Sequence, residues 1–483
     1  MMHSRRLALG SLLMACANIT KAGLQLIMLP LLAHLIGPGD YGLFSLAMPV
    51  VMLVMSLADG GLGTSLAREK EENKIVWSSA WWLLLGLAIV LIPSVIGVSF
   101  IQSSIVHEPR LPHVITALSI CLLFFILSVT SGAILFRQGR IGIGAAGDIA
   151  ATIISALLAY ILASNGAGVW SLVAQTLSAY GIRFLFSFSM APYLPEFLFS
   201  WHAVRPHLLV GGSIVGLKLG DLVERNIENV LIGRAFGTSV LGIYSLANQI
   251  PSFIAGAVGN IIWTNIYARA LHTTDTRRQA QIFEKFVRLL ALIHFPVTAI
   301  GVVEAPAAIA IFLGPQWQGL SPLLELFLIA DVVTALAGIM GAIFLAHGRA
   351  GVQLRINTEI NIMRAVIVLF APHLGLLGCV IGISLASLYG LARSVTTLVK
   401  TIDLTIGQIL KAIRGAFVGS VVAALTSYVL SQQLSLPAVW AVILSGMGGL
   451  VAYCCSLVLT DREYLVLELK SIWRMLKKPP SAV

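Results

Sequence analysis

Long apolar stretches that recur along the whole chain are the feature that most constrains its fold. A helix needs about 20 apolar residues to cross the hydrocarbon core of a bilayer. Fourteen candidate stretches lie at residues 7–36, 41–63, 77–101, 113–136, 143–163, 168–189, 210–236, 242–262, 287–313, 322–346, 356–373, 375–398, 412–431 and 437–459. The sequence therefore predicts an all-α polytopic membrane protein with about fourteen transmembrane helices.

Composition supports this class and excludes others. Hydrophobic residues make up 58% of the 483 and charged residues 11%, whereas soluble domains contain roughly half and a quarter. Only short polar segments separate the apolar stretches, so a soluble enzyme with a single membrane anchor and a large extramembrane domain are both excluded. The five cysteines show neither metal nor disulfide spacing, so we assign them no function. We predict no metal site and no cofactor.

The distribution of basic residues predicts the orientation in the membrane. Lys and Arg collect in the cytoplasmic loops of membrane proteins. With the N-terminus in the cytoplasm, 24 of the 31 Lys and Arg residues fall in cytoplasmic segments, and only Arg110 and Arg234 fall in outer loops. We therefore expect both termini in the cytoplasm, and the net charge of +10 needs no nucleic-acid partner.

The two ends of the chain carry further signals. Ala15-Cys16-Ala17 resembles a signal-peptidase site after a basic start, but the apolar stretch continues to Ile36, which favours an uncleaved first helix. After the last stretch, residues 461–478 follow an amphipathic pattern with basic flanks. We expect this tail to lie flat on the cytoplasmic leaflet and to contact membrane lipids.

A short motif occurs twice in the chain. The motif Tyr41-Gly-Leu-Phe-Ser-Leu-Ala47 returns 200 positions later as Leu241-Gly-Ile-Tyr-Ser-Leu-Ala247. Just upstream, Leu35-Ile-Gly37 matches Leu231-Ile-Gly233, with a connection four residues longer in the second copy. Chance similarity between apolar helices is the alternative explanation.

The repeat predicts the domain organisation. Six predicted helices separate the two copies, an even number, so both halves have the same orientation in the membrane. We expect two six-helix lobes related by a pseudo-two-fold axis along the membrane normal. The N-lobe would cover residues 1–207 and the C-lobe residues 208–400, with helices 13 and 14 and the amphipathic tail in 401–483.

The seventh apolar stretch carries a stripe of polar side chains. The members of the stripe are Lys218, Asp221, Arg225, Glu228 and Asn229, with Glu224 at its border. At 100° per residue the stripe is about 100° wide and about 16 Å long. Ionisable groups at bilayer depth face a partner or a water-filled cavity, so we expect this stripe to line a cavity between the lobes. The alternative is that the acids and bases only pair within the helix.

The first helix carries a matching set of polar residues. Asn18, Lys21 and Gln25 share one face. Lys21 precedes Gly37 by 16 residues and Lys218 precedes Gly233 by 15, so the two lysines are expected at similar depth. Together with Arg225 they would suit an anionic group such as a phosphate or diphosphate.

Other ionisable and amide residues within the stretches are weaker candidates. Arg364 lies in the middle of a stretch, and Asn248 would either hydrogen-bond a sugar or hold helices together. The acids Glu224, Glu304 and Asp331 would either bind a coupling proton or cation or lie near helix ends.

Three segments resemble a known family. Leu35–Ala47, Asp59–Arg68 and Asn229–Gly237, the last followed by the second motif copy, resemble Wzx-type polysaccharide flippases of the multidrug/oligosaccharidyl-lipid/polysaccharide exporter superfamily. The resemblance implies a transporter, not an enzyme, in the bacterial cytoplasmic (inner) membrane. It would move undecaprenyl-diphosphate-linked oligosaccharide repeat units to the outer leaflet for surface polysaccharide, exopolysaccharide or O-antigen synthesis. Two lobes would rock about a central cationic cavity, and a polysaccharide polymerase and export machinery would be partners.

The acids of the seventh stretch depart from a purely cationic cavity and leave alternatives open. A cation-coupled multidrug antiporter would rely on buried carboxylates such as Asp221, Glu224 and Glu304. A membrane-embedded polymerase or ligase would need a sizeable outer loop, which this sequence lacks. A peptidoglycan-precursor (lipid II) flippase is a closer alternative within the superfamily.

Overall fold

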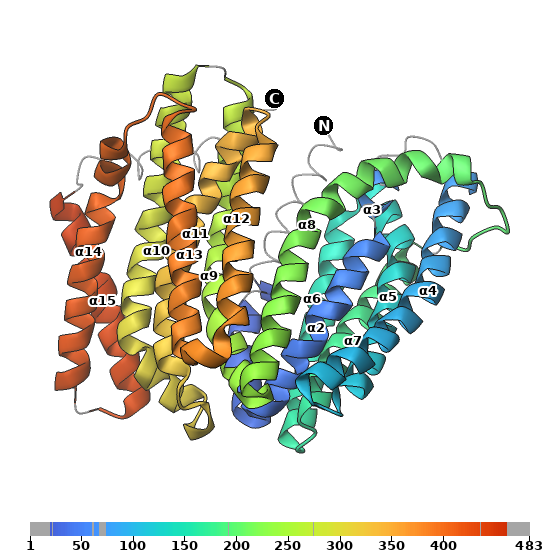
Figure 1. Ribbon diagram of the computed structural model, residues 1–483, viewed down its shortest axis with the longest axis horizontal. Helices are drawn as coiled ribbons and strands as arrows, with labels where there is room; N and C mark the ends of the chain where they lie inside the picture. The colour runs from blue at the N-terminus through green and yellow to red at the C-terminus, as the bar shows by residue number, and fades with distance from the viewer. Residues whose placement is uncertain are drawn as a thin grey trace. The chain divides into compact units, whose positions relative to one another are not determined.

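The computed structural model describes residues 20–21, 23–59, 62–66, 74–191, 193–273, 275–434 and 436–460, and within these ranges no strand occurs (Figure 1). A helix over Gly23–Ile36 precedes the numbered elements. The long helices are α2 (Pro38–Asp59), α4 (Lys74–Val106), α5 (Leu111–Arg137), α6 (Ile141–Ser164), α7 (Val169–Met190), α8 (Trp201–Phe236), α9 (Thr238–Leu271), α10 (Thr276–Phe312), α11 (Leu320–Ala346), α12 (Ala350–Leu369), α13 (Ala371–Val399), α14 (Ile406–Gln433) and α15 (Ala438–Thr460), and the short elements are α3 (Leu62–Leu66) and the 3-10 helix η1 (Pro315–Trp317).

Nine helices within the described residues are long and apolar enough to cross a membrane, so the protein is a multi-pass membrane protein. These nine are α2, α4, α5, α6, α10, α11, α13, α14 and α15. Spans are also predicted in the ranges of the other four long helices, α7, α8, α9 and α12. The described residues of these four are not apolar enough over a membrane-spanning length to be counted with the nine. The count of fourteen spans stays a prediction. The amphipathic tail at 461–478 and the possible signal-peptidase site lie outside the described residues.

Several helices are longer than the apolar stretches that predict them. The helix α10 begins at Thr276 rather than 287, and α8 begins at Trp201 rather than 210. The early start of α10 has a local cause, because the Asp275 side chain accepts a hydrogen bond from the Arg277 backbone N–H at 3.0 Å and caps the helix. Backbone hydrogen bonding therefore continues past the edge of the apolar stretch, which sequence hydropathy does not detect.

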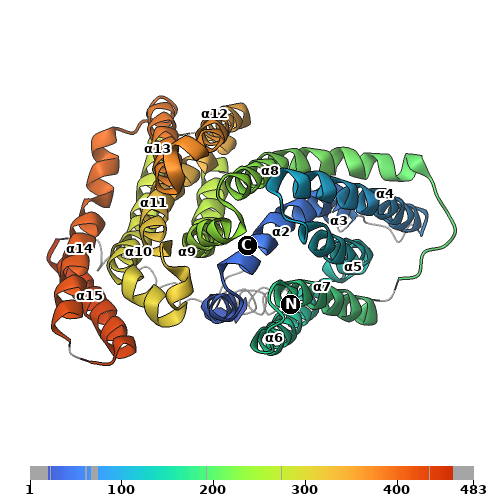
Figure 2. The same cartoon turned by 60° about the horizontal axis from the view of Figure 1, so that its bottom comes forward.

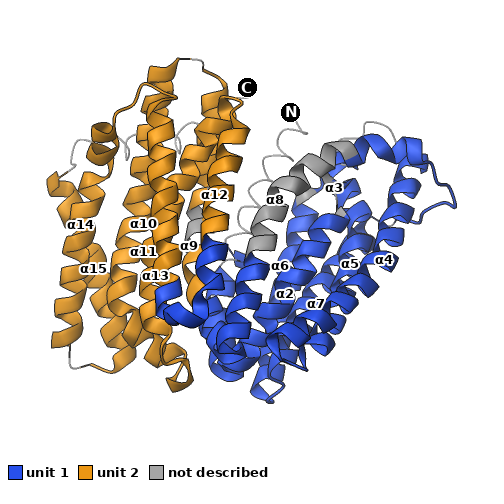
Figure 3. Cartoon of the chain, viewed as in Figure 1, with its two compact units in different colours: residues 1–246, 364–379 blue, residues 247–363, 380–483 orange. Residues whose placement is uncertain are grey.

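The chain divides into two compact units (Figure 3). Unit 1 comprises residues 1–246 and 364–379, and within it α5 packs against α2, α4 and α7. Unit 2 comprises residues 247–363 and 380–483, and within it α10 packs against α11, α14 and α15. Figures 1 and 2 both show α14 and α15 beside α10. The core of unit 2 includes the fully buried Phe283, Val287 and Phe344.

The two copies of the sequence repeat meet in unit 1 through their glycines. A Cβ atom on Gly42 would overlap the Thr238 carbonyl oxygen and lie 2.8 Å from the Gly242 backbone nitrogen. Reciprocally, a Cβ on Gly242 would overlap the Pro38 carbonyl oxygen and lie 3.0 Å from the Gly42 nitrogen. Small residues let helix backbones approach this closely. The first turns of α2 and α9 therefore cross in backbone contact at equivalent positions of the repeat.

The turns before the two helices correct the upstream alignment of the repeat. Gly37 and Gly237 both adopt a left-handed conformation, with φ of 80° and 84°. In each turn the carbonyl oxygen of the glycine accepts a hydrogen bond from the residue four positions later, Tyr41 or Leu241. The offset of 200 thus extends through the turn, and Gly37 corresponds to Gly237 rather than to Gly233.

This correction changes the expected relation between the two lysines. Lys21 lies 16 residues before its turn glycine, whereas Lys218 lies 19 residues before Gly237. At 1.5 Å per residue, this difference of three residues corresponds to about 4.5 Å along the helix axis. In the corrected alignment Lys21 corresponds to Asp221, and similar depth of the two lysines stays a prediction.

Asp40 ties together segments that are distant in sequence within unit 1. Its Oδ1 lies 2.9 Å from Nη1 of Arg110, which precedes α5, and its Oδ2 accepts a hydrogen bond from the Val169 backbone N–H at 3.1 Å. A carboxylate at the N-terminus of α7 is favourable because unpaired N–H groups point toward it. Arg110 also pairs with Glu108 at 2.9 Å, and this hydrogen bond raises the pKa of Arg110 above its usual value.

The glycine crossing generates a stability prediction. Replacing Gly42 or Gly242 by Ala should force α2 and α9 apart and cost about 1–3 kcal/mol, the range for overpacking a close contact. Each variant should lose its monodisperse elution after heating at a lower temperature than the wild-type protein, measured by size-exclusion chromatography in detergent.

Gly86→Ala is the matched control, because a Cβ at this α4 position meets nothing within 4 Å. This variant should keep the wild-type melting behaviour or improve on it. Equal stability of Gly42→Ala, Gly242→Ala and Gly86→Ala would contradict the backbone contact.

Candidate functional site

The cationic residues predicted on the first and seventh helices lie in unit 1. Lys21 and Gln25 are half-buried and Arg225 is exposed. Asn18 lies outside the described residues, as do the side chains of Lys218, Asp221 and Glu224, although their backbone belongs to α8. The structure therefore tests the stripe only at its end near the turn.

At that end of α8 the polar side chains bind neighbouring helices. Asn229 donates a hydrogen bond from Nδ2 to the Ser45 carbonyl oxygen of α2 at 2.7 Å. Glu228 is 4% exposed and its Oε2 accepts a hydrogen bond from the Tyr244 hydroxyl of α9 at 3.2 Å. These contacts are not those of pairing within the helix, which is the alternative considered for the stripe. They join α8 to both helices of the glycine crossing.

Two further predicted residues have less defined surroundings. The Asn248 side chain on α9 is half-buried, and its backbone carbonyl accepts the Ser252 hydroxyl at 2.8 Å. Arg364 on α12 is half-buried.

Glu304 is the hub of a buried hydroxyl cluster in unit 2. It is 6% exposed, and its Oε1 accepts hydrogen bonds from Ser427 of α14 at 2.6 Å and Ser445 of α15 at 2.7 Å. Buried carboxylates are costly unless hydrogen-bonded. One carboxylate oxygen thus joins α10 to both C-terminal helices, in the middle of an apolar bundle.

Asp331 lies beside a histidine that the sequence analysis did not select. Oδ2 of Asp331 on α11 is 3.4 Å from Nε2 of His294 on α10. The ring is 1% exposed. A single histidine in an apolar stretch has no diagnostic spacing, so only the neighbouring helix reveals the pair.

A second cluster that the sequence analysis missed lies on α12 and α13 in unit 2. Glu359 accepts hydrogen bonds from Nε of Arg393 at 3.2 Å and from the Tyr389 hydroxyl at 2.9 Å. Arg355, one turn before Glu359, also pairs with it at 3.1 Å. The spacing of Arg355 and Glu359 is a helical pairing signal, but the contribution of α13 required the structure.

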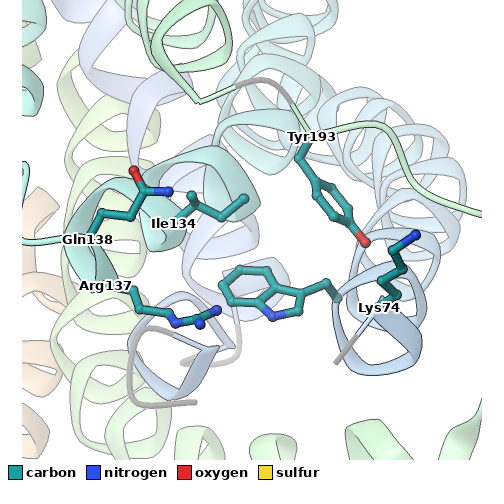
Figure 4. A pocket seen from close by; sticks show the side chains of 6 residues that line it. Lys74, Ile134, Arg137, Gln138 and Tyr193 are labelled. Atoms are coloured by element: carbon teal, nitrogen blue, oxygen red, sulfur yellow. The ribbon is translucent and has the colours of Figure 1, made fainter. Parts of the chain in front are cut away.

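A cavity of about 460 Å³ lies in unit 1, and it is lined by Lys74, Trp77, Ile134, Arg137, Gln138 and Tyr193. In Figure 4, Arg137 and Gln138 lie on one side and Lys74 and Tyr193 on the other. Lys74 pairs with Glu196 at 2.6 Å, and the Tyr193 hydroxyl is 2.9 Å from Oγ of Ser78. Burial raises the pKa of Tyr193, so its hydroxyl stays protonated at neutral pH and can donate a hydrogen bond.

Comparison with known proteins shows the family. The family described as "Polysaccharide biosynthesis protein" matches residues 31–322. The chain belongs to this family. The matched range contains both copies of the repeat and the whole of α8. It also contains His294, whereas Asp331 lies beyond its end.

Two curated relatives are similar along much of the chain. The lipopolysaccharide biosynthesis protein WzxC of Escherichia coli (strain K12) is 23% identical over 396 residues, which are 80% of this chain and 80% of WzxC. The succinoglycan biosynthesis transport protein ExoT of Rhizobium meliloti (strain 1021) is 24% identical over 310 residues, which are 63% of this chain and 62% of ExoT.

A solved structure shows the same fold. The lipid II flippase MurJ in an inward closed conformation matches with a TM-score of 0.74 and 13% identity, over 94% of this chain and all of that chain. At this identity the match concerns the fold alone.

The Glu304 cluster generates a second stability prediction. Replacing both Ser427 and Ser445 by Ala removes both hydroxyl donors from a buried carboxylate, which should cost about 1–3 kcal/mol. The double variant should therefore unfold at a lower temperature than wild type, measured by tryptophan fluorescence of the purified protein in detergent.

Ser431→Ala is the matched control on α14, because this half-buried serine donates a hydrogen bond to the Tyr428 carbonyl of its own helix. It should unfold like the wild-type protein. A double variant as stable as Ser431→Ala would show that the serines do not stabilise Glu304.

Proposed function

We propose that this chain moves lipid-linked polysaccharide repeat units from the cytoplasmic to the outer leaflet of the bacterial cytoplasmic membrane. The observation that carries the proposal is the family match over residues 31–322, in a chain with nine described helices able to cross a membrane. Its relatives are named for lipopolysaccharide biosynthesis and succinoglycan biosynthesis transport. In this proposal the chain is a transporter and carries out no enzymatic reaction.

The carrier lipid that fits this role is undecaprenyl diphosphate bearing an oligosaccharide. Its diphosphate and sugars cannot cross the hydrocarbon core unaided, because they would lose their hydration without compensation. Lys21 and Arg225, two cations on helices of unit 1, would replace part of that hydration. Alternating access would then expose the head group to the other side. An inside-negative potential favours outward movement by about 2.3 kcal/mol per charge per 100 mV.

The same proposal assigns the remaining polar residues. Substrate contacts extend from Lys21 and Arg225 to Asn18, Gln25, Lys218, Asp221, Asn248 and Arg364. Glu228 and Asn229 would act indirectly, since their hydrogen bonds to Tyr244 and the Ser45 carbonyl hold α8 in place. Glu224, Glu304 and Asp331 are the acids available for ion coupling.

The lobe boundaries and the orientation belong to this proposal as well. The lobes would cover residues 1–207 and 208–400, followed by helices 13 and 14 and the tail in 401–483. Both termini would face the cytoplasm, where most Lys and Arg residues fall in the predicted loops. A polysaccharide polymerase and export machinery would act on the product in the outer leaflet.

The proposal is tested by deleting the gene and identifying the lipid-linked oligosaccharide that accumulates. We expect loss of surface polysaccharide and accumulation of a diphosphate-linked repeat unit on the cytoplasmic leaflet, measured by mass spectrometry of extracted lipids. Accumulation of lipid II would instead indicate a peptidoglycan-precursor flippase. Unchanged lipids with sensitivity to cationic dyes would indicate a multidrug antiporter.

Complementation tests the cationic residues. Lys21→Ala and Arg225→Ala should each abolish polysaccharide export while the folded protein remains in the membrane, because each removes a charge that binds the diphosphate. Lys400→Ala is the control, since this exposed lysine follows the end of α13 at Val399, and it should restore full export. Export by both Lys21→Ala and Arg225→Ala at the level of Lys400→Ala would contradict the assignment.

A further inference from the structure

His294 is a buried histidine at the middle of a candidate membrane helix. It is residue 19 of the 37 in α10, and 1% of it is exposed. Neither ring nitrogen has a hydrogen-bond partner within the part of the chain that the structure describes. The neighbouring acid is Asp331, whose Oδ2 lies 3.4 Å from Nε2 and whose side chain is 17% exposed.

Packing alone does not account for this pair. The helix on either side of His294 contributes Leu290 and Phe295 to the apolar core cluster of unit 2, so an apolar side chain would fill the position as well. A buried polar group without a hydrogen bond costs about 1–3 kcal/mol, and a carboxylate at bilayer depth costs more. An imidazole and a carboxylate at this depth in a membrane helix are therefore candidates for binding an ion or a proton.

The donor set favours a proton over a metal ion. Calcium and magnesium bind about six or more oxygen ligands, whereas this pair offers one imidazole and one carboxylate. Within the described residues no third His, Cys, Asp or Glu joins them to form a metal-binding group. Imidazole is instead the side chain whose charge changes between about pH 5 and 8.

We propose that the His294–Asp331 pair binds the proton that couples this transporter to the proton gradient. A proton from water, reached through the partly exposed Asp331, binds the lone pair of Nε2 and later returns to water. No other bond changes in this step. The role in coupling rests on the proposed function, whereas proton binding itself does not.

Charge explains why proton binding would bias a conformational change. With the proton bound, imidazolium and carboxylate form an ion pair whose charges cancel. Without it, the neutral ring leaves the Asp331 carboxylate with an uncompensated negative charge. A rearrangement that removes the pair from water is less costly for the neutral pair, so the protonated state moves more readily.

The nearby groups on the same helix are already paired. Arg288 lies six residues before His294 and pairs with Glu284 at 3.6 Å. Glu304 lies ten residues after it, about 15 Å along the helix, and accepts the two serine hydroxyls of α14 and α15. These groups therefore do not compete with Asp331 for the imidazole.

The helices packed against α10 bring few other ionisable groups to this level. On α15 the Tyr453 hydroxyl donates to the Leu292 carbonyl at 2.9 Å. On α14 the ring of Phe417 lies 6.5 Å from that of Phe295, so the exposed Arg414 is about one turn away. On α11 the acid nearest to Asp331 in sequence is Glu325, which accepts the Ser321 hydroxyl at 2.7 Å. The described residues of η1 carry no ionisable side chain.

The test is a titration of the purified full-length protein in lipid nanodiscs, with ¹⁵N-labelled histidine and no added substrate. The nitrogen resonances of His294 are identified by their loss in His294→Gln. The spectra are recorded between about pH 5 and 8, the range in which imidazole side chains ordinarily change charge, and we expect the His294 resonances to change with pH. In Asp331→Asn the proton affinity should fall at least about tenfold, because the carboxylate that stabilises imidazolium is gone.

His272→Gln is the matched control, since His272 is exposed just after the end of α9. This variant should leave the His294 titration unchanged. A His294 resonance that stays in one state across this range, or that titrates identically in Asp331→Asn, would overturn the proposal. Asp331→Asn keeps the size of the side chain, and its fold is checked by elution and melting temperature.

Export in cells separates this inference from the proposed function. If export depends on the chain, collapsing the proton gradient with nigericin should reduce export by wild type, and His294→Gln should lose export. Continued wild-type export under nigericin would overturn the coupling role. A titrating pair in a chain whose deletion leaves polysaccharide unchanged would contradict the proposed function and leave proton binding intact.

Discussion

The backbone contact between Gly42 and Gly242 is the constraint on which the rest of unit 1 depends. The carbonyl oxygens of Pro38 and Thr238 occupy the space that a side chain on either glycine would need. Helices this close bring secondary contacts within reach. Asn229 then reaches the main chain of α2, and Tyr244 reaches Glu228 on α8. The position of α8, which carries three of the proposed substrate-binding residues (Lys218, Asp221 and Arg225), therefore depends on the absence of side chains at these two glycines.

The fold class could be predicted from hydropathy, because apolar length decides whether a helix can cross a bilayer. The ends of helices could not, since a cap such as Asp275 extends α10 into a polar segment. The repeat was recognisable from identical residues, but its register through the turn was misjudged. Residue identity favoured Gly233, whereas the left-handed backbone conformation identifies Gly237 as the counterpart of Gly37.

Ionisable groups that make polar contacts inside the bundle could be predicted where they lay in an apolar stretch, as at Glu304 and Asp331. Their partners were not, because a partner is set by which helix lies alongside. Ser427 and Ser445 are ordinary small residues in sequence, and they become donors only when α14 and α15 pack on α10. His294 and the Arg393–Glu359 pair escaped notice for the same reason. The sequence predicts that the stripe on α8 forms a single surface, yet Glu228 and Asn229 bind two different helices.

The contacts of Asp40 bear on how mutational scans of such transporters are interpreted. Acid residues whose loss abolishes transport are commonly assigned to ion coupling. Substitution of Asp40 would also reduce transport, because its carboxylate accepts the Val169 N–H at the start of α7 and pairs with Arg110 ahead of α5. Its phenotype would come from assembly of the bundle and would appear as reduced protein in the membrane. A carboxylate needed for transport can therefore be distinguished from one needed for assembly only when the amount of protein in the membrane is measured together with transport activity.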